Sequence, residues 1–239
     1  MARSTAPALV LIHSPLVGAL TWRPCIGLLQ ARGFRVVVPS LAGVVDDGQP
    51  YYSKLAARVA EVVRADRPAG PLVLIGHSGA GALLPAVAAA CPSVVEAAVL
   101  VDAILPHPGA SWFDTAPPAL REHLRNLATD GWLPPWDQWF PPGTLDLLLP
   151  DPDPRARFVA ELPRLPVAYF EERAPVVPDQ ARQHAYLQLS EAYQDVADEA
   201  ERRGWPTLRE AVDHLAMLTR PESVVSQLGR LIGRLVGTA

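Results

Sequence analysis

Ser78 is the residue of this sequence whose setting best fits nucleophilic chemistry. It lies in PLVLIGHSGAG, residues 71–81, where an apolar run typical of a buried strand leads into a turn of the G-x-S-x-G type and then a helix. Such a turn holds a serine hydroxyl above the edge of a sheet, because small neighbours let the backbone fold tightly. The N–H of Gly79 would then face the oxyanion that forms when the serine attacks a carbonyl. A serine hydroxyl is a weak nucleophile, so this chemistry also needs a base and an acid that orients the base.

The elements around this turn alternate between strands and helices. Strands are predicted at residues 8–13, 35–40, 71–77, 95–103, 185–190 and 206–212. Helices are predicted at residues 19–32, 53–66, 79–91, 192–204 and 221–236. Strands that are buried on both faces and alternate with helices predict a parallel sheet with right-handed crossovers. The expected fold class is therefore α/β, with a mostly parallel six-stranded sheet flanked by helices.

A long segment interrupts this alternation. Residues 104–183 hold most of the prolines and tryptophans, and only PVAYF, residues 166–170, has the pattern of a strand. Such a segment is too long for an ordinary loop. We therefore predict an inserted cap (104–183) over the carboxyl edge of an α/β core (1–103 and 184–239). Its apolar groups, such as DGWLPPWDQWF, either line a pocket for a hydrophobic substrate or fill the core of the cap itself.

Composition argues against several other classes of protein. The net charge of −4 is spread without blocks, which argues against binding to nucleic acid or to an anionic membrane surface. The apolar runs are too short to cross a bilayer. Cys25 and Cys91 lack the spacing of metal ligands, and no phosphate-binding or dinucleotide-binding glycine motif is present, so we expect neither a metal nor a cofactor. The first residues lack a signal-peptide pattern, so we expect a cytoplasmic protein, as a monomer or homodimer.

The chain resembles the α/β-hydrolase superfamily over nearly its whole length. The strand-to-helix turn at Ser78 carries part of this resemblance. The opening loop HSPLVGALTW, residues 13–22, is especially similar to the plant-type esterase and hydroxynitrile lyase branch, where it usually reads H-G-x-x-x-G-A-W-x-W. The matching residues are His13, Gly18, Ala19 and Trp22. Ser14 and Leu20 stand where the branch has glycine and tryptophan.

The resemblance implies a Ser–His–Asp triad. Its histidine follows the last strand, where AVDHLAMLTRPESV, residues 211–225, contains His214. Its acid lies either in the loop after the strand before last or at the end of the preceding strand. The first position falls near Ala192 or Tyr193, with Glu191 as a neighbouring carboxylate, and the second is Asp102. We expect Asp102 to be the acid and keep Glu191 as the alternative.

Pro15 poses a problem for the oxyanion site that the resemblance implies. In the resembling branch the second donor is the N–H two residues after the loop histidine, and proline has no N–H. Either the Leu16 N–H takes this role, or the Ser14 hydroxyl does, as a threonine hydroxyl at this position serves the substrate in the resembling lyases. A third reading is that the register differs and Pro15 only stiffens the loop. The expected oxyanion and substrate-binding residues are therefore Gly79, Ser14, Pro15 and Leu16.

Together these residues predict a cofactor-independent serine hydrolase that acts on an ester or thioester of a small hydrophobic substrate. Ser78 would attack, His214 would transfer the proton and Asp102 would orient His214. Two alternatives stay open. One is a lyase or cyclase of the same fold that uses His214 as a general base, and the other is a non-catalytic small-molecule-binding protein.

Overall fold

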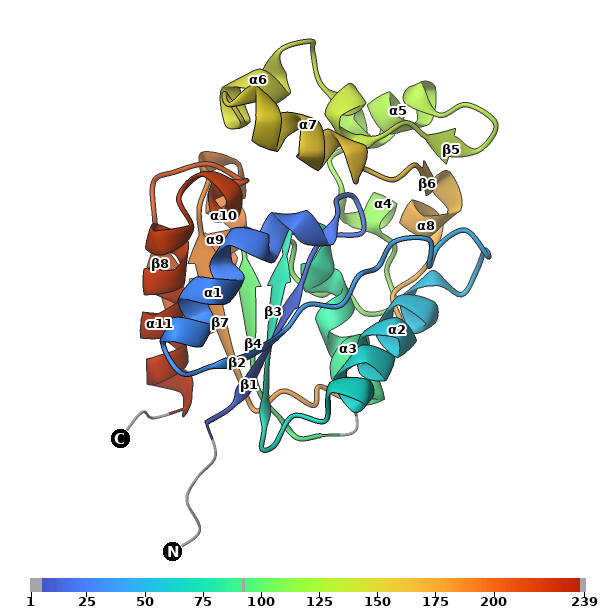
Figure 1. Cartoon of the computed structure of the whole chain (residues 1–239). Coiled ribbons are helices and arrows are strands. Elements are labelled where there is room, and N and C mark those ends of the chain that lie inside the picture. The colour runs from blue at the N-terminus through green and yellow to red at the C-terminus, as the bar shows by residue number, and fades with distance from the viewer. Residues whose placement is uncertain (1–5, 92, 237–239) are drawn as a thin grey trace, which may run out of the picture.

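The computed structural model describes residues 6–91 and 93–236, and its centre is a single sheet of six parallel strands (Figure 1). In chain order these are β1 (Ala8–Ile12), β2 (Arg35–Val37), β3 (Leu72–His77), β4 (Val95–Val101), β7 (Gln183–Gln188) and β8 (Thr207–Arg209). Their order across the sheet is β2-β1-β3-β4-β7-β8, and every pair of neighbours is parallel. The predicted α/β fold with six sheet strands is confirmed.

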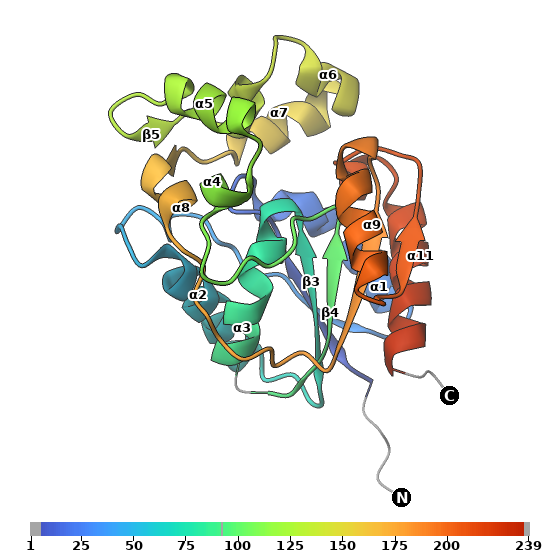
Figure 2. The same ribbon diagram turned by 180° about the vertical axis from the view of Figure 1, so that it is seen from behind.

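Helices cover both faces of this sheet (Figures 1 and 2). The helices α2 (Tyr51–Asp66), α3 (Leu84–Ala90) and α9 (Gln194–Arg202) pack on one face, and α1 (Arg23–Ala31) and α11 (Pro221–Val236) pack on the other. Successive strand residues therefore meet different helices: Val10 faces the first group and Leu9 the second. This two-sided burial explains why the strands read as continuous apolar runs.

Two of the predicted helices begin as 3₁₀-helices. Residues Ala19–Trp22 form η1 before α1, and Ser78–Leu83 form η2 before α3. Pro24 and Pro85 lie in the first turns of the α-helices that follow. A proline suits this place, because the first N–H groups of a helix have no partner within the helix. None of the helices in the described part of the chain is long and apolar enough to cross a membrane.

The segment between β4 and β7 lies over the carboxyl end of the sheet (Figure 1). It consists of α4 (Trp112–Thr115), α5 (Pro118–Leu127), β5 (Trp132–Leu133), η3 (Trp136–Trp139), α6 (Thr144–Leu148), α7 (Pro152–Ala160), β6 (Leu165–Pro166) and α8 (Val167–Glu171). The strand predicted at 166–170 is wrong, because β6 ends at Pro166 and a helix begins at Val167. Tyr169 and Phe170 are both buried in one cluster, which a helical turn permits and a strand would prevent by pointing them to opposite faces.

Two glutamates hold this cap on the core. The carboxylate of Glu172 accepts the backbone N–H groups of Tyr51 (2.8 Å) and Tyr52 (2.9 Å) at the start of α2. Glu161 Oε2 accepts the N–H of Leu20 at 2.9 Å. Gly18 leaves room for that carboxylate, since a Cβ there would lie 2.1 Å from Glu161 Oε2. Negative groups are favourable at the starts of helices, so both contacts stabilise the docked cap.

Candidate active site

Ser78 lies on a tight turn directly after β3. Its φ of 56° is in the left-handed region, which a residue other than glycine adopts at a cost in energy. The turn departs from the G-x-S-x-G pattern at its last position, which holds Ala80. The close approach falls instead on Gly81, where a Cβ would lie 2.1 Å from the carbonyl oxygen of Ile104. The Ser78 carbonyl oxygen in turn accepts the N–H of Ile104 at 3.2 Å, which ties the turn to the segment after β4.

Asp102, immediately after β4, pairs with His214. Its Oδ2 lies 2.7 Å from Nδ1 of His214. Its Oδ1 accepts the N–H groups of Leu189 (2.8 Å) and Ser190 (3.0 Å), and the Ser190 hydroxyl donates to Oδ2 at 2.6 Å. Burial raises the pKa of Asp102, but the hydrogen bonds from His214 and Ser190 outweigh that effect and lower it. The carboxylate is therefore ionised and fixed in an orientation that suits the imidazole of His214.

Three aromatic side chains from different elements surround the His214 ring. Tyr193 stacks parallel to it, with ring centroids 5.1 Å apart and an interplanar angle of 2°. The ring of His77 packs with its centroid 4.5 Å from that of His214, and its Nε2–H donates to the His214 carbonyl oxygen at 3.0 Å. The ring centroid of Trp136, from the cap, lies 6.1 Å from that of His214. Burial lowers the pKa of His77 well below its ordinary value, so this histidine is neutral and acts as a donor.

Sequence reasoning missed Ser190 and Tyr193 and gave His77 no part in the site. Ser190 lies just before the loop position where the resemblance places the usual acid, and Tyr193 lies at or next to it, but their residue types carried no signal. Glu191, the alternative acid, is exposed. Within the described part of the chain, it forms no hydrogen bond or ion pair with His214. Nor does any hydrogen bond there join Ser78 Oγ to His214, a contact that commonly tightens only when substrate binds.

The loop after β1 lies directly against Gly79. A Cβ on Gly79 would lie 2.8 Å from Ser14 Oγ and 3.7 Å from Pro15 Cδ. His13 fixes the loop, because its Nδ1–H donates to the Ser14 carbonyl oxygen (2.8 Å) and its Nε2 accepts the Leu41 N–H (3.1 Å). The Leu16 N–H points at Ser14 Oγ, at 3.2 Å. Of the two replacement donors expected for Pro15, the Leu16 N–H is thus engaged within the loop.

A comparison of the sequence with models of protein families shows which family this chain belongs to. The model of the alpha/beta hydrolase family matches residues 9–227. The chain belongs to this family. The resemblance noted in the sequence is confirmed, and no curated protein was found to match the chain.

Solved structures of other α/β-hydrolases share the fold. An extracellular α/β-hydrolase from a Paenibacillus species has a TM-score of 0.74 and 19% identity, and the match covers 95% of this chain and 99% of that one. A pyrethroid hydrolase from Sphingobium faniae JZ-2 has a TM-score of 0.74 and 20% identity, with 95% and 98% covered. The methylesterase MES16 from Arabidopsis has a TM-score of 0.69 and 16% identity, with 96% and 100% covered. A plant esterase is therefore among the structures that share this fold.

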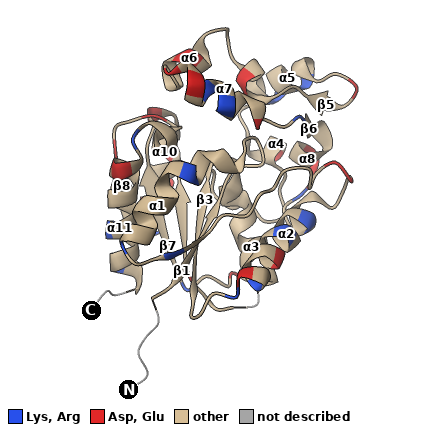
Figure 3. Ribbon diagram, viewed as in Figure 1, with Lys and Arg blue, Asp and Glu red and all other residues tan. Residues whose placement is uncertain are grey.

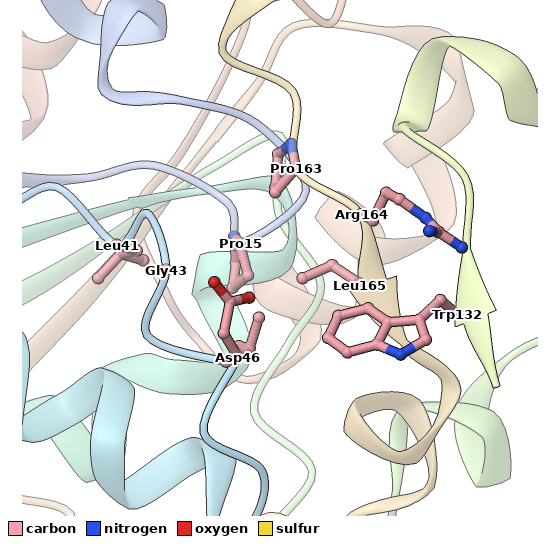
Figure 4. Close-up of a pocket in the computed structure, with 9 residues that line it drawn as sticks. Pro15, Leu41, Gly43, Asp46, Trp132, Pro163, Arg164 and Leu165 are labelled. Carbon is pink, nitrogen blue, oxygen red and sulfur yellow. The ribbon is translucent and has the colours of Figure 1, made fainter. Parts of the chain in front are cut away.

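Beside Pro15 this α/β-hydrolase has a cavity of about 340 Å³ between core and cap (Figure 4). It is lined by Pro15, Leu41, Gly43, Val45, Asp46, Trp132, Pro163, Arg164 and Leu165. Figure 4 shows Pro15 and Asp46 opposite Leu165 and Trp132. Most of the lining is apolar, and the two charged residues have opposite signs.

Acidic and basic residues are both spread over the core and the cap (Figure 3). Among the described residues, no group of three or more His, Cys, Asp or Glu side chains is arranged to hold a metal ion.

Proposed function

We propose that this α/β-hydrolase is a serine hydrolase that cleaves an ester or thioester of a small hydrophobic substrate. The observation that carries the proposal is the 2.7 Å contact between Asp102 and His214, formed beside the strained turn that presents Ser78. An ionised carboxylate on Nδ1 leaves Nε2 of His214 as the base. The names of similar structures, a pyrethroid hydrolase and a methylesterase, support ester chemistry.

The proposed reaction uses each of these groups in turn. Ser78 Oγ attacks the substrate carbonyl carbon while His214 Nε2 takes the hydroxyl proton, and Asp102 stabilises the imidazolium. His214 then gives the proton to the leaving group, and the acyl group stays on Ser78. Water attacks this acyl-enzyme with His214 again as base, which releases the acid and restores Ser78.

The oxyanion formed in these steps lies near Gly79. We assign its donors as the Gly79 N–H and the Ser14 hydroxyl. Ser14 Oγ accepts the Leu16 N–H, so its own hydrogen is available for donation. Pro15 adds no N–H to this site. The site therefore depends on side-chain hydroxyls more than an oxyanion site that is built from two backbone N–H donors.

The hydrophobic substrate class follows from the cap. Trp136 reaches the His214 ring from η3, and the cavity beside Pro15 is walled by Trp132, Leu165 and other apolar residues. Binding sites with mostly apolar walls and few polar groups favour hydrophobic ligands whose orientation those polar groups fix.

A test combines labelling with turnover. The wild type, Ser78→Ala, His214→Ala and the double variant are treated with a fluorophosphonate probe and assayed on a panel of esters and thioesters. We expect labelling only where Ser78 is present. Each single variant should lose most of kcat, and the double variant should lose little more, because the triad acts as a unit. Additive losses, or turnover by Ser78→Ala, would contradict the proposal.

A lyase or cyclase is the second candidate, favoured by the missing N–H at Pro15. Such an enzyme would use His214 as a base and the Ser14 hydroxyl as a substrate contact, without an acyl-enzyme. In that case Ser14→Ala reduces activity, whereas Pro15→Ala raises generic ester hydrolysis by restoring a donor. If Ser14→Ala is silent and Pro15→Ala gains nothing, this candidate loses its support.

A further inference from the structure

Tyr193 is a polar side chain of the site that the proposed mechanism leaves without a role. It ends the short 3₁₀-helix η4 (Glu191–Tyr193) that follows β7. Its ring stacks on the His214 ring, with ring centroids 5.1 Å apart, and its hydroxyl is close enough to Ser78 for that side chain to act on its pKa. One side chain therefore lies close to both residues that exchange a proton in the proposed reaction.

The phenol of Tyr193 is a neutral donor. Burial raises its pKa to about 12, against the opposing effect of the Ser78 side chain, so it keeps its proton at any ordinary working pH. Tyr186, in β7, provides a contrast. Its hydroxyl donates to the Ala103 carbonyl oxygen (2.8 Å) and accepts the Ala103 N–H (3.0 Å), so it is occupied with holding the backbone. In the part of the chain that is described, no hydrogen bond ties the Tyr193 hydroxyl to the backbone in this way.

The proposed oxyanion site lacks one of the usual backbone donors, so a further hydrogen-bond donor would aid the reaction. The position that usually supplies the second backbone donor is Pro15, and the neighbouring Leu16 N–H points at Ser14 Oγ. Loss of one oxyanion donor typically costs roughly 10²–10³ in kcat. A neutral hydroxyl held near the nucleophile by stacking on His214 would act beside the Ser14 hydroxyl to compensate for that loss.

We propose that the Tyr193 hydroxyl is a catalytic hydrogen-bond donor to the substrate oxygen that becomes negative when Ser78 attacks. The assignment rests on the proposed hydrolase function. In the free enzyme the phenol lies near Ser78, and in the reaction it donates to the substrate oxygen bound beside Ser78. No proton is transferred to or from Tyr193, so the balance of the reaction is unchanged. The alternative is a purely structural role, in which the ring only holds His214 in place.

Tyr193→Phe separates these roles, because phenylalanine keeps the stack on His214 and removes only the hydroxyl. Tyr51→Phe is the matched control: Tyr51 packs against Tyr169 at the contact between α2 and the cap. The wild type and both variants are compared in kcat, KM and fluorophosphonate labelling rate on the best ester of the panel, with thermal unfolding as a check of folding. We expect Tyr193→Phe to lose about 10²-fold in kcat and a similar factor in labelling rate, with KM changed less than about threefold. Tyr51→Phe should match the wild type.

Two results would overturn the assignment, and they differ in what else they overturn. If Tyr193→Phe turns over ester at the wild-type rate while Ser78→Ala is inactive, the serine hydrolase stands and the role of Tyr193 is only structural. If Ser78→Ala keeps its activity, the proposed function fails and the Tyr193 assignment fails with it.

Discussion

At the residue scale, Asp102 shows how far the proposed acid depends on groups outside the proposed triad. Its carboxylate takes part in four hydrogen bonds, and only one of them is with His214. The others come from Leu189 and Ser190 just after β7. A buried charge is tolerated when its oxygens are satisfied, and here these bonds also turn Oδ2 toward Nδ1 of His214. The position of the acid is thus set by the pairing of β4 with β7.

Replacement of this acid gives a direct test at the same scale. Asp102→Asn should lower kcat by roughly 10⁴-fold with the fold intact, because an amide no longer holds the imidazole in the required tautomer. Glu191→Gln, a matched change at the exposed alternative, should leave kcat unchanged. Steady-state kinetics on the best ester and circular dichroism check both variants. The reverse ranking would place the acid in the loop after β7.

At the element scale, the cap uses its tryptophans in two ways. Trp136 and Trp139 lie at the two ends of η3 and contact different neighbours. Trp139 is buried, packs on Phe170, and its Nε1–H donates to the Pro134 carbonyl oxygen at 2.9 Å. Trp136 instead reaches His214 and packs on Phe158. Trp139 therefore holds the cap together, and Trp136 faces the candidate site.

We expect the alanine variants of these two tryptophans to separate substrate preference from stability. Trp136→Ala should change the ratio of kcat/KM between short and long acyl chains, because it opens space beside His214. Trp139→Ala should lower the free energy of unfolding by about 3–5 kcal/mol, as large-to-small changes in a core do. A chain-length series and urea unfolding measure the two effects. Unchanged preference in Trp136→Ala would place that ring in the core of the cap alone.

At the scale of the whole molecule, the sequence predicted the features that local patterns encode. The continuous apolar strands indicated the sheet, and the turn at Ser78 indicated its upper edge. Cap elements such as α4 and α8 are only four or five residues long, too short for a helical period to stand out. Ser190 and Tyr193 reach the site through pairing of β7 with both β4 and β8, a long-range arrangement that no local pattern contains.

Also at this scale, the stability of the fold depends on pH, because histidines far apart in the sequence are buried in the folded protein. His13 and His77 are 1% and 0% exposed, and burial lowers the pKa of both. Below about pH 6.5 the unfolded chain protonates these histidines while the folded chain does not, so the unfolded state binds more protons. Their contribution to stability is therefore complete above that pH and is lost as the pH falls. The lowered pKa of Asp102 acts in the same direction, but only below about pH 4.

We therefore expect His13 and His77 together to lower the free energy of unfolding by up to about 2–3 kcal/mol from pH 6.5 to 5.5, since each buried histidine contributes at most about 1.4 kcal/mol per pH unit. Urea unfolding at a series of pH values measures this slope. His77→Gln is the informative variant, because its amide N–H can still donate to the His214 carbonyl oxygen while the side chain no longer titrates. It should reduce the slope by the share of one proton, at most about 1.4 kcal/mol per pH unit. If the variant keeps the full slope, or the wild type shows none above pH 5, the acid sensitivity does not originate in these buried rings.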